Sequence, residues 1–267
     1  MRFRVRQLRG AEGNRVSEVV LETRNLSRHF EGLAAVDGVS VSCRMREVHA
    51  VIGPNGAGKS TLVNLLSGDL RPSAGHVFLH GEDVTHLPSP RISHLGVGRS
   101  YQKTNVFLPF TVFENCRLAA QSRLPGPMRF FRPARRYRAL SDAAMAAIEQ
   151  VGLSRQADQT VATLSHGEQR QVEIAMTLAT GPSLLLLDEP LAGMGAEESL
   201  RIVELLQSLA DDHAIVLVEH DMDAVFTLAH TLTVMVNGAV LETGTPAQVR
   251  ASRSVQLAYL GEDHHAR

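Results

Sequence analysis

The chain contains very little lysine, very little cysteine and no long apolar run. Lys59 and Lys103 are the only lysines among its 27 basic side chains, so arginine supplies almost all of its positive charge. The two cysteines, Cys43 and Cys116, lie far apart and fit neither a metal-ligand nor a disulfide spacing, which suits a reducing compartment. No apolar run approaches the roughly 20 residues that a membrane-spanning helix needs, and we expect no secretory signal peptide.

A net excess of charge is also absent. The 27 basic and 28 acidic side chains nearly cancel, giving a formal net charge of −1, so no overall field favours binding to nucleic acid. Hydrophobic residues make up 44% of the chain and charged residues 21%, which is the composition of an ordinary globular protein. A chain of 267 residues can bury one large core, or one core and a smaller satellite domain.

One glycine-rich stretch lies between a predicted strand and a predicted helix. The apolar run 48–52 has the length and β-branching of a strand, and Leu62, Leu65 and Leu66 fall on one face of a helix. A Gly-x-x-x-x-Gly-Lys-Ser pattern in this strand–loop–helix setting is typical of a phosphate-binding loop. Here the loop reads Gly53-Pro54-Asn55-Gly56-Ala57-Gly58-Lys59-Ser60.

The residue types of this loop suit the phosphates of a nucleotide. Glycines let the backbone approach phosphate closely, so that successive N–H groups point into one concavity. The helix that follows directs the positive end of its dipole at the same anion. We expect Lys59 to reach the β- and γ-phosphates and the Ser60 hydroxyl to ligate Mg²⁺. The use of lysine here, in a chain that otherwise uses arginine, favours that role.

Two carboxylates follow a second buried strand. The leucines at 184–187 lead directly into Asp188 and Glu189, and the carboxyl ends of strands are where ligands bind in doubly wound sheets. We expect Asp188 to hold Mg²⁺, directly or through water. Glu189 is then placed to orient or deprotonate the attacking water, a role that contributes roughly 10²–10⁴ in rate. Two merely solvated carboxylates fit poorly after a run of leucines.

Two further strand ends carry polar residues. His220 follows the apolar run 215–218, and we interpret it as a γ-phosphate contact that stabilises developing charge. Gln102 ends the strand predicted at 97–102 and is a candidate for sensing Mg²⁺ and the attacking water. Both assignments depend on the whole set of motifs, because a lone histidine is more often structural.

The rest of the chain alternates strand and helix patterns around a helical middle segment, which indicates the α/β class. The helix at 141–151 is predicted to have Ser141 as its N-cap and Gly152 just past its end. Asn237-Gly238 is a strong hairpin signal. Further strands are predicted at 19–21, 35–36, 39–41, 75–79, 231–236 and 240–241, and further helices at 112–121, from 165 to the stop at Gly181-Pro182, at 196–209 and from about 222.

Two features stay open. The segment around 122–140 carries arginines and aromatics, and it either meets lipid headgroups or a partner or is a solvated insertion. The histidines of the region after the first helix match no metal-ligand spacing; they are His76, His80, His86 and His94.

Taken in order, these motifs resemble an ABC-transporter ATP-binding subunit, over about residues 19–262. A Ser-x-Gly-x-Gln string at the start of a helix is the signature that separates ABC ATPases from other P-loop proteins. The resemblance implies an α/β fold, with a P-loop ABC ATPase core, an antiparallel β subdomain and an inserted helical subdomain. It rests on the loop at 53–60, Gln102, the string Leu164-Ser165-His166-Gly167-Glu168-Gln169, the pair Asp188-Glu189, and His220.

The resemblance also implies a division of the chain. Residues 1–18, which carry arginines but little apolar periodicity, are expected to be a disordered N-terminal extension. Residues 19–104 form the first part of the ATP-binding core, with the phosphate loop and the β subdomain. Residues 105–180 form the helical subdomain with the signature. Residues 181–267 complete the core and end in a C-terminal tail.

An ABC ATPase is implied to bind ATP and Mg²⁺ and to work as a head-to-tail dimer. Each ATP would lie between one subunit's phosphate loop and the other's signature helix. Phe30 matches the aromatic that stacks on adenine, with a core phenylalanine as the alternative. The implied residues are Phe30, Gly53, Pro54, Asn55, Gly56, Ala57, Gly58, Lys59, Ser60 and Thr61 for ATP; Ser165, His166, Gly167, Glu168 and Gln169 for ATP in trans; Ser60, Gln102 and Asp188 for Mg²⁺; and Glu189, His220 and Gln102 for catalysis.

A narrower resemblance, to ATP-binding subunits of branched-chain amino-acid importers, is carried by the strings at 99–102, 108–115, 192–195, 218–223 and 258–262. It implies two integral-membrane permease subunits, a second ATPase subunit that is this chain or a paralogue, and indirectly a solute-binding protein, without nucleic acid. The implied place is cytoplasmic, peripheral on the inner face of the cell membrane. Urea-type importers share much of this pattern and remain an alternative.

Two other classes are less well supported. A soluble ABC ATPase acting on ribosomes or DNA usually shows two ATPase halves, long insertions or basic tails. A P-loop kinase does not explain the signature string or His220. Three departures from the family pattern are His166 and Arg46, which stand at common glycine positions, and Gly195, which replaces an aspartate, so no inter-subunit carboxylate is assigned there.

Overall fold

The computed structural model describes residues 18–101, 105–123 and 138–260. A six-stranded sheet supplies the strand ends on which the site depends, and its strand order is β11-β10-β4-β9-β8-β7. All of these strands run parallel to their neighbours except β11, which pairs antiparallel with β10. Their bounds are β4 (Val48–Ile52), β7 (Val97–Arg99), β8 (Leu184–Asp188), β9 (Ala214–Val218), β10 (Thr231–Val236) and β11 (Ala239–Gly244).

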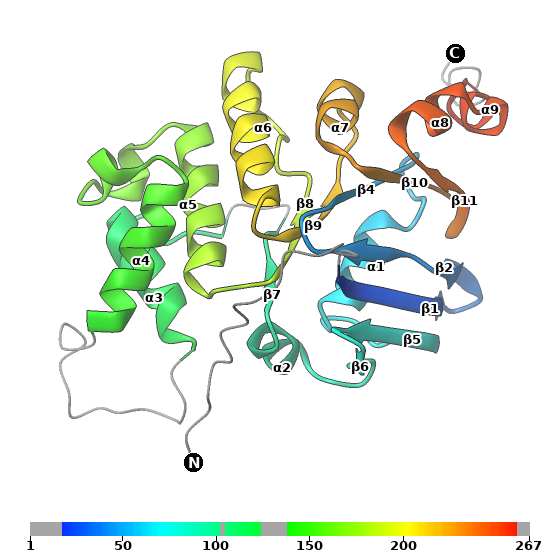
Figure 1. Ribbon diagram of the computed structural model, residues 1–267, viewed down its shortest axis with the longest axis horizontal. Coiled ribbons are helices and arrows are strands. Elements are labelled where there is room, and N and C mark those ends of the chain that lie inside the picture. The colour runs from blue at the N-terminus through cyan, green and yellow to red at the C-terminus, as the bar shows by residue number, and fades with distance from the viewer. Residues whose placement is uncertain (1–17, 102–104, 124–137, 261–267) are drawn as a thin grey trace, which may run out of the picture.

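This sheet is buried on both faces because its strands are apolar at consecutive positions. Leu184 and Leu186 pack on one face, in the same cluster as α1 (Lys59–Leu66). Leu185 and Leu187 point to the opposite face, as the two-residue period of a strand requires, and pack with α6 (Ala196–Ala210). The helices α7 (Met222–Leu228), α8 (Pro246–Ala251) and α9 (Arg253–Leu260) continue this outer layer over β4 and β10 (Figure 1).

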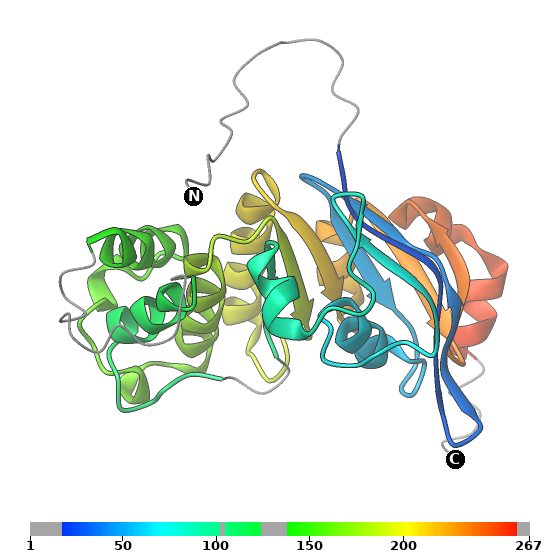
Figure 2. The ribbon, with the colours of Figure 1, turned by 90° about the horizontal axis from the view of Figure 1, so that it is seen from below.

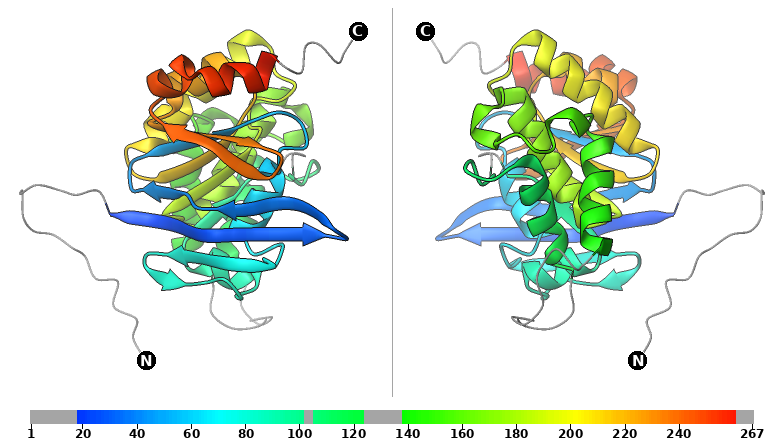
Figure 3. Two further views of the ribbon diagram at one scale, coloured as in Figure 1. Left: turned by 90° about the vertical axis from the view of Figure 1, so that its right-hand side faces the viewer. Right: turned by 90° about the vertical axis from the view of Figure 1, so that its left-hand side faces the viewer.

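A second, antiparallel sheet covers the other face together with α1. Its strand order is β2-β1-β5-β6, and β3 pairs with β1. Figure 3 shows the layers from the side, with α8 and α9 above the β10–β11 hairpin and the antiparallel strands below. The strands are β1 (Val19–Phe30), β2 (Leu33–Val39), β3 (Ser42–Arg44), β5 (Ala74–Leu79) and β6 (Glu82–Asp83), and α2 (Ser89–His94) lies between β6 and β7.

Three longer helices gather at one end of the molecule, with the two sheets at the other (Figure 2). They are α3 (Val112–Gln121), α4 (Arg138–Gln150) and α5 (His166–Ala179), with 3₁₀ turns at Ser154–Gln156 and Val161–Thr163. All three pack against one another, and α5 also contacts β7 and α6. Helix α5 therefore joins the helical part to the parallel sheet.

The antiparallel sheet, the parallel core and the inserted helices confirm the predicted fold class. The prediction that Ser141 caps a helix is wrong, because α4 already includes Arg138 and Ser141 lies inside it. Leu140 is buried in line with Ala144, so the apolar stripe carries the helix through Ser141. Gly152 follows the end of α4 with φ of 78°, as predicted.

Other differences lie in the antiparallel strands and in three short helices. Strand β1 is a single strand of 12 residues rather than a short one, and its register with β2 shifts between Leu26 and His29. The helices α2, α8 and α9 were not predicted. Asn237 and Gly238 have φ of 49° and 82°, which confirms the predicted hairpin turn. Arg46, at a common glycine position, has φ of 64°.

Three predictions concern residues outside the described ranges. They are the N-terminal extension up to residue 17, the role of Gln102, and the contact or insertion proposed for most of the 122–140 segment. Within the part of the chain that the structure describes, no helix is both long and apolar enough to cross a membrane. The same part of the chain holds no group of three or more His, Cys, Asp or Glu side chains arranged to bind a metal.

Candidate functional site

The phosphate loop is held by contacts that only glycine permits. It connects β4 to α1, and Gly58, the N-cap of α1, has φ of 96°. A Cβ on Gly58 would lie 2.1 Å from the carbonyl oxygen of Ala35 on β2. A Cβ on Gly53 would lie 2.1 Å from the carbonyl oxygen of Met235 on β10. The loop backbone is therefore pressed against both sheets, and a side chain at either position would displace it.

This loop lines a pocket of about 560 Å³. The Nζ atom of Lys59 donates to the carbonyl oxygens of Gly53 at 2.6 Å and Pro54 at 2.9 Å. The side chain therefore folds back onto the start of the loop. The N-terminus of α1 adds its positive dipole end at the same place. The pocket is lined by Leu33, Ala34, Ala35, Asn55, Gly56, Ala57, Gly58, Lys59, Ser60, Thr61, Glu189 and Asn237.

Asp188 ends β8 beside the start of α1. Its side chain is buried, the Ser60 hydroxyl is hydrogen-bonded to it, and its Oδ1 atom has no hydrogen-bond partner. Burial raises the pKa of Asp188 and the Glu189 carboxylate adds to this, while Arg99, Ser60 and Lys59 act in the opposite direction. A hydroxyl beside a buried, incompletely paired carboxylate fits Mg²⁺, which takes few protein oxygens and completes its shell with waters and phosphates.

Glu189 has an unusual backbone conformation for its residue type. Its φ is 50°, in the left-handed region that residues with a side chain avoid. The N–H of Glu189 donates to the carbonyl oxygen of Val218 at 2.9 Å, which ties the turn to β9. Its Oε1 atom lies 3.6 Å from Nδ1 of His220, so the strand ends of β8 and β9 bring the two predicted catalytic side chains together.

Glu219 is a buried carboxylate to which the sequence analysis gave no role. It is 1% exposed, and it accepts the N–H of Leu191 at 2.8 Å and that of His220 at 3.1 Å. Burial raises its pKa, and these two N–H groups act against that effect. Glu219 thus links the residue after the Glu189 turn to the predicted catalytic histidine. The sequence signal that could have identified this carboxylate is its position directly after an apolar strand.

The signature string forms the N-terminus of α5. Ser165 is the N-cap, its hydroxyl accepts the N–H of Glu168, and the Glu168 carboxylate accepts the N–H of Ser165 in return. The N–H of Gly167 donates to Oε1 of Glu198 on α6 at 3.2 Å. Neither His166 nor any other signature residue lines the phosphate-loop pocket of the same chain.

Besides the signature residues, five predicted site residues within the described part of the chain do not line that pocket: Phe30, Gly53, Pro54, Asp188 and His220. Phe30 ends β1, is 41% exposed and has the Arg28 guanidinium 4.6 Å from its ring centre, whereas Leu33 of the same hairpin lines the pocket. Gln102 lies outside the described residues. Its neighbour Ser100 donates its N–H to the carbonyl oxygen of Leu186, so the chain still runs along β8 just before Gln102.

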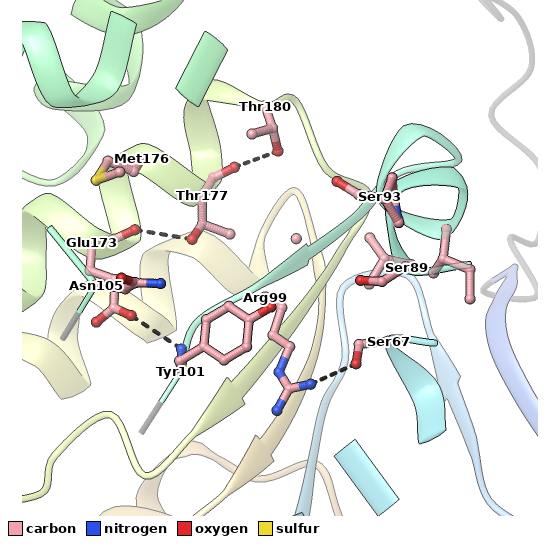
Figure 4. Close-up of a pocket in the computed structure, with 14 residues that line it drawn as sticks. Ser67, Ser89, Ser93, Arg99, Tyr101, Asn105, Glu173, Met176, Thr177 and Thr180 are labelled. Atoms are coloured by element: carbon pink, nitrogen blue, oxygen red, sulfur yellow. Dashed lines mark hydrogen bonds between the residues drawn. The ribbon is translucent and has the colours of Figure 1, made fainter. Parts of the chain in front are cut away.

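A second pocket of about 310 Å³ lies between α2, β7 and α5 (Figure 4). On one side Arg99 donates to Ser67 Oγ at 2.6 Å and pairs with Asp69 at 2.5 Å. On the other side the N–H of Tyr101 donates to Glu173 Oε1 at 3.1 Å, a bond drawn in Figure 4. The walls of this pocket therefore come from both the parallel sheet and the helical part.

Known proteins match the chain over almost its whole length. A family model described as ABC transporter matches residues 36–192. The high-affinity branched-chain amino acid transport ATP-binding protein BraF of Pseudomonas aeruginosa is 37% identical over 255 residues, covering 92% of this chain and 100% of the relative. A ribose import ATP-binding protein of Rubrobacter xylanophilus is 34% identical over 241 residues, covering 90% of this chain and 47% of that relative.

Solved structures agree with the fold. An ATP-binding cassette of an ABC transporter, in its ADP conformation, superposes with a TM-score of 0.82 at 28% sequence identity. The superposition covers 91% of this chain and 99% of that cassette.

Proposed function

The chain belongs to the ABC transporter ATP-binding family and is an ABC transporter ATPase, and on that premise we propose that it energises the import of branched-chain amino acids. The main observation in support of this function is that three strand ends of the parallel sheet lie close together. The loop after β4 and Glu189 after β8 line one pocket, and His220 after β9 lies 3.6 Å from the Glu189 carboxylate.

The proposed reaction is hydrolysis of ATP to ADP and phosphate. Lys59 and the N–H groups of the loop bind the phosphates, and Glu189 orients the attacking water and accepts its proton. His220 stabilises the charge that develops on the γ-phosphate. Ser60 and Asp188 would hold Mg²⁺, which would supply positive charge to offset that of the phosphates. Gln102, three positions after the last residue of β7 in the sequence, is proposed to sense this centre.

We propose that two ATPase subunits close head to tail around two ATP molecules. Ser165 and Gly167 at the N-terminus of α5 then contact the γ-phosphate bound by the partner subunit. The absence of signature residues from the phosphate-loop pocket of the same chain supports a contact made between subunits. Only a nucleotide with its γ-phosphate bridges both halves, so hydrolysis loosens the dimer.

Transport itself is assigned to partner subunits. We propose that two permease subunits bind this ATPase at the inner face of the cell membrane, and that the second ATPase subunit is either this chain or a paralogue. The solute assignment rests on relatives such as BraF at 37% identity. The ribose importer at 34% identity is a reason to test other small solutes, including urea.

Glu189→Gln is the variant that tests the ATPase mechanism. The amide keeps the shape of the side chain but cannot accept the proton of water, so we expect turnover to fall by roughly 10²–10⁴. ATP binding should be retained, because the phosphate loop is unchanged. Steady-state ATPase rates and equilibrium nucleotide binding measure the two quantities. A Glu189→Gln protein that hydrolyses ATP at the parental rate contradicts the role of Glu189.

The transport assignment is tested by capture of partners. Tagged Glu189→Gln protein is incubated with ATP and detergent-solubilised membranes of its own host, and bound proteins are identified by mass spectrometry. We expect two polytopic permease subunits, and Lys59→Ala with ATP is the control that should capture less. Uptake of labelled leucine and of urea by cells with and without the chain then separates the two solutes. Capture of ribosomal or DNA-bound proteins alone would overturn the transport role.

A further inference from the structure

Arg170 is a charged side chain buried beside the catalytic turn, and the proposed mechanism does not use it. It lies on α5 and is 5% exposed. An arginine has five N–H donors in a fixed planar fork, and each of those donors has an acceptor here. Its partners are one carboxylate and four main-chain carbonyl oxygens, from Tyr101, Asp188, Glu189 and Pro190.

Three of the acceptors are consecutive in the chain. Nε donates to the carbonyl oxygen of Pro190 at 3.1 Å, and Nη2 donates to those of Glu189 at 2.8 Å and Asp188 at 3.4 Å. This is the turn in which Glu189 has φ of 50°. A glutamate keeps that conformation only where its surroundings hold it, and one guanidinium binds the carbonyls on both sides of it.

The remaining donors tie the same side chain to the end of β7. Nη1 donates to the carbonyl oxygen of Tyr101 at 2.9 Å and to the Glu173 carboxylate. The N–H of Tyr101 donates to the other oxygen of Glu173 at 3.1 Å (Figure 4). The Arg170–Glu173 pair therefore binds both main-chain polar groups of Tyr101, the residue that precedes Gln102.

Glu173 keeps the buried arginine neutralised. It lies three residues further along α5, it is 4% exposed, and its carboxylate accepts from Arg170 and from Tyr101. A buried charge without a partner is strongly destabilising, so the pair acts as one unit. Arg170→Lys is therefore the informative substitution, because it removes the planar guanidinium but keeps a positive charge beside Glu173.

We propose that Arg170 is a positioning residue for Glu189. From the helix that begins with the signature, it fixes the turn after β8 and the end of β7, so that the Glu189 carboxylate lies against the phosphate loop. This inference rests on the proposed role of Glu189 as the base. Arg170 does not line the phosphate-loop pocket, and its effect is exerted through the main chain at 188–190.

The test compares Arg170→Met and Arg170→Lys, each made alone and together with Glu189→Gln. Loss of the fork should lower kcat by about 100-fold in Arg170→Met, the scale expected when a catalytic group is misplaced by about 1 Å. In the Glu189→Gln background, ATP affinity should stay within about threefold of that of Glu189→Gln alone, because the base is already absent there. Arg170→Lys keeps the charge beside Glu173 and should recover part of the rate.

The control is Arg24→Met, which breaks the exposed Arg24–Glu22 pair on β1 and should leave kcat at the parental value. A kcat within about threefold of the parent in Arg170→Lys overturns the inference, as does an equal loss of ATP affinity and kcat in that variant, which marks a general structural role. If Arg170→Met fails to fold, Arg170→Lys decides alone. Normal turnover by Glu189→Gln would instead remove the premise, the proposed role of Glu189.

Discussion

His49 on β4 is a buried histidine outside the nucleotide pocket. It is 2% exposed, with Nδ1 2.8 Å from the Ser42 carbonyl oxygen and Nε2 2.8 Å from Thr233 Oγ1. Burial lowers the pKa of His49 below its ordinary value of 6.5, and the Ser42 carbonyl and Glu47 oppose only part of that effect. The folded ring therefore stays neutral at pH values where the unfolded chain already binds a proton.

This difference predicts a loss of stability in mild acid. The unfolded chain takes up a proton that the folded chain refuses, so the contribution of His49 is present above a pH of about 6.5 and is lost as the pH falls. Between a pH of about 7.5 and about 5.5, the free energy of unfolding should fall less in His49→Gln than in the parent. Urea unfolding at both pH values measures it, and exposed His76→Gln is the control. Equal falls in His49→Gln and parent would contradict the assignment.

Individual site residues could be predicted where a short motif identifies them. Lys59 and Glu189 were found because their neighbours in sequence are also their neighbours in the site. Arg170 and Glu219 were missed, because the groups that they bind come from distant segments, such as Tyr101 for Arg170. Arginine and glutamate three residues apart on one helix face was a weak signal for the buried pair, since such pairs are usually solvated.

Two helices of the helical part begin with the same local structure. The effect of a cap on stability can therefore be separated from its effect on dimer formation. Thr111 caps α3 and Ser165 caps α5, and in each case a glutamate three residues later completes a capping box. Replacing either cap by alanine should cost about 1 kcal/mol of stability. Ser165→Ala should also weaken ATP-dependent dimer formation, while Thr111→Ala should not.

Thermal unfolding and light scattering of the Glu189→Gln background with ATP measure these two effects. Similar losses of stability with a loss of dimer only in Ser165→Ala would support the signature contact between subunits. If Thr111→Ala weakens the dimer as much, the effect comes from loosening of the helical part, and the direct role of the Ser165 hydroxyl is wrong.

Helices and strands were predicted well where their buried residues recur at the spacing of that element or where a capping motif marks their start. Strand β4 and helix α3 have the predicted bounds, because every residue of β4 is buried and α3 begins at a capping box. Ser141 was misread because a residue type that favours caps lies inside an apolar stripe. The helices α2 and α8 have only six residues each, too few to show a period, and both have proline in their first turn.

The molecule as a whole is predicted to be active only with a partner subunit. Lys59→Ala and Ser165→Ala each damage both composite sites of a homodimer, one through the phosphate loop and the other through the signature helix. In a mixture, a heterodimer carries one site with both changes and one with neither. Equal amounts should therefore recover up to roughly a quarter of the parental ATPase rate, if the sites act independently.

The mixture is compared with each variant alone at the same total concentration. A rate no higher than the mean of the two variants would contradict head-to-tail pairing of this chain with a second copy of itself. Recovery has to depend on protein concentration, because it requires exchange of subunits.

The place of β4 in its sheet has a consequence for synthesis. Within the described residues its ladder partners are β9 and β10, with Val48 opposite Ile215 and His49 opposite Thr231. The main chain of Met235 on β10 also packs closely against Gly53. The phosphate loop thus leaves the ribosome well before the strands that hold it, and at roughly 5–20 residues per second it waits for many seconds. A half-made chain lacks β9 and β10, so we expect it to bind ATP only when its translation is almost complete.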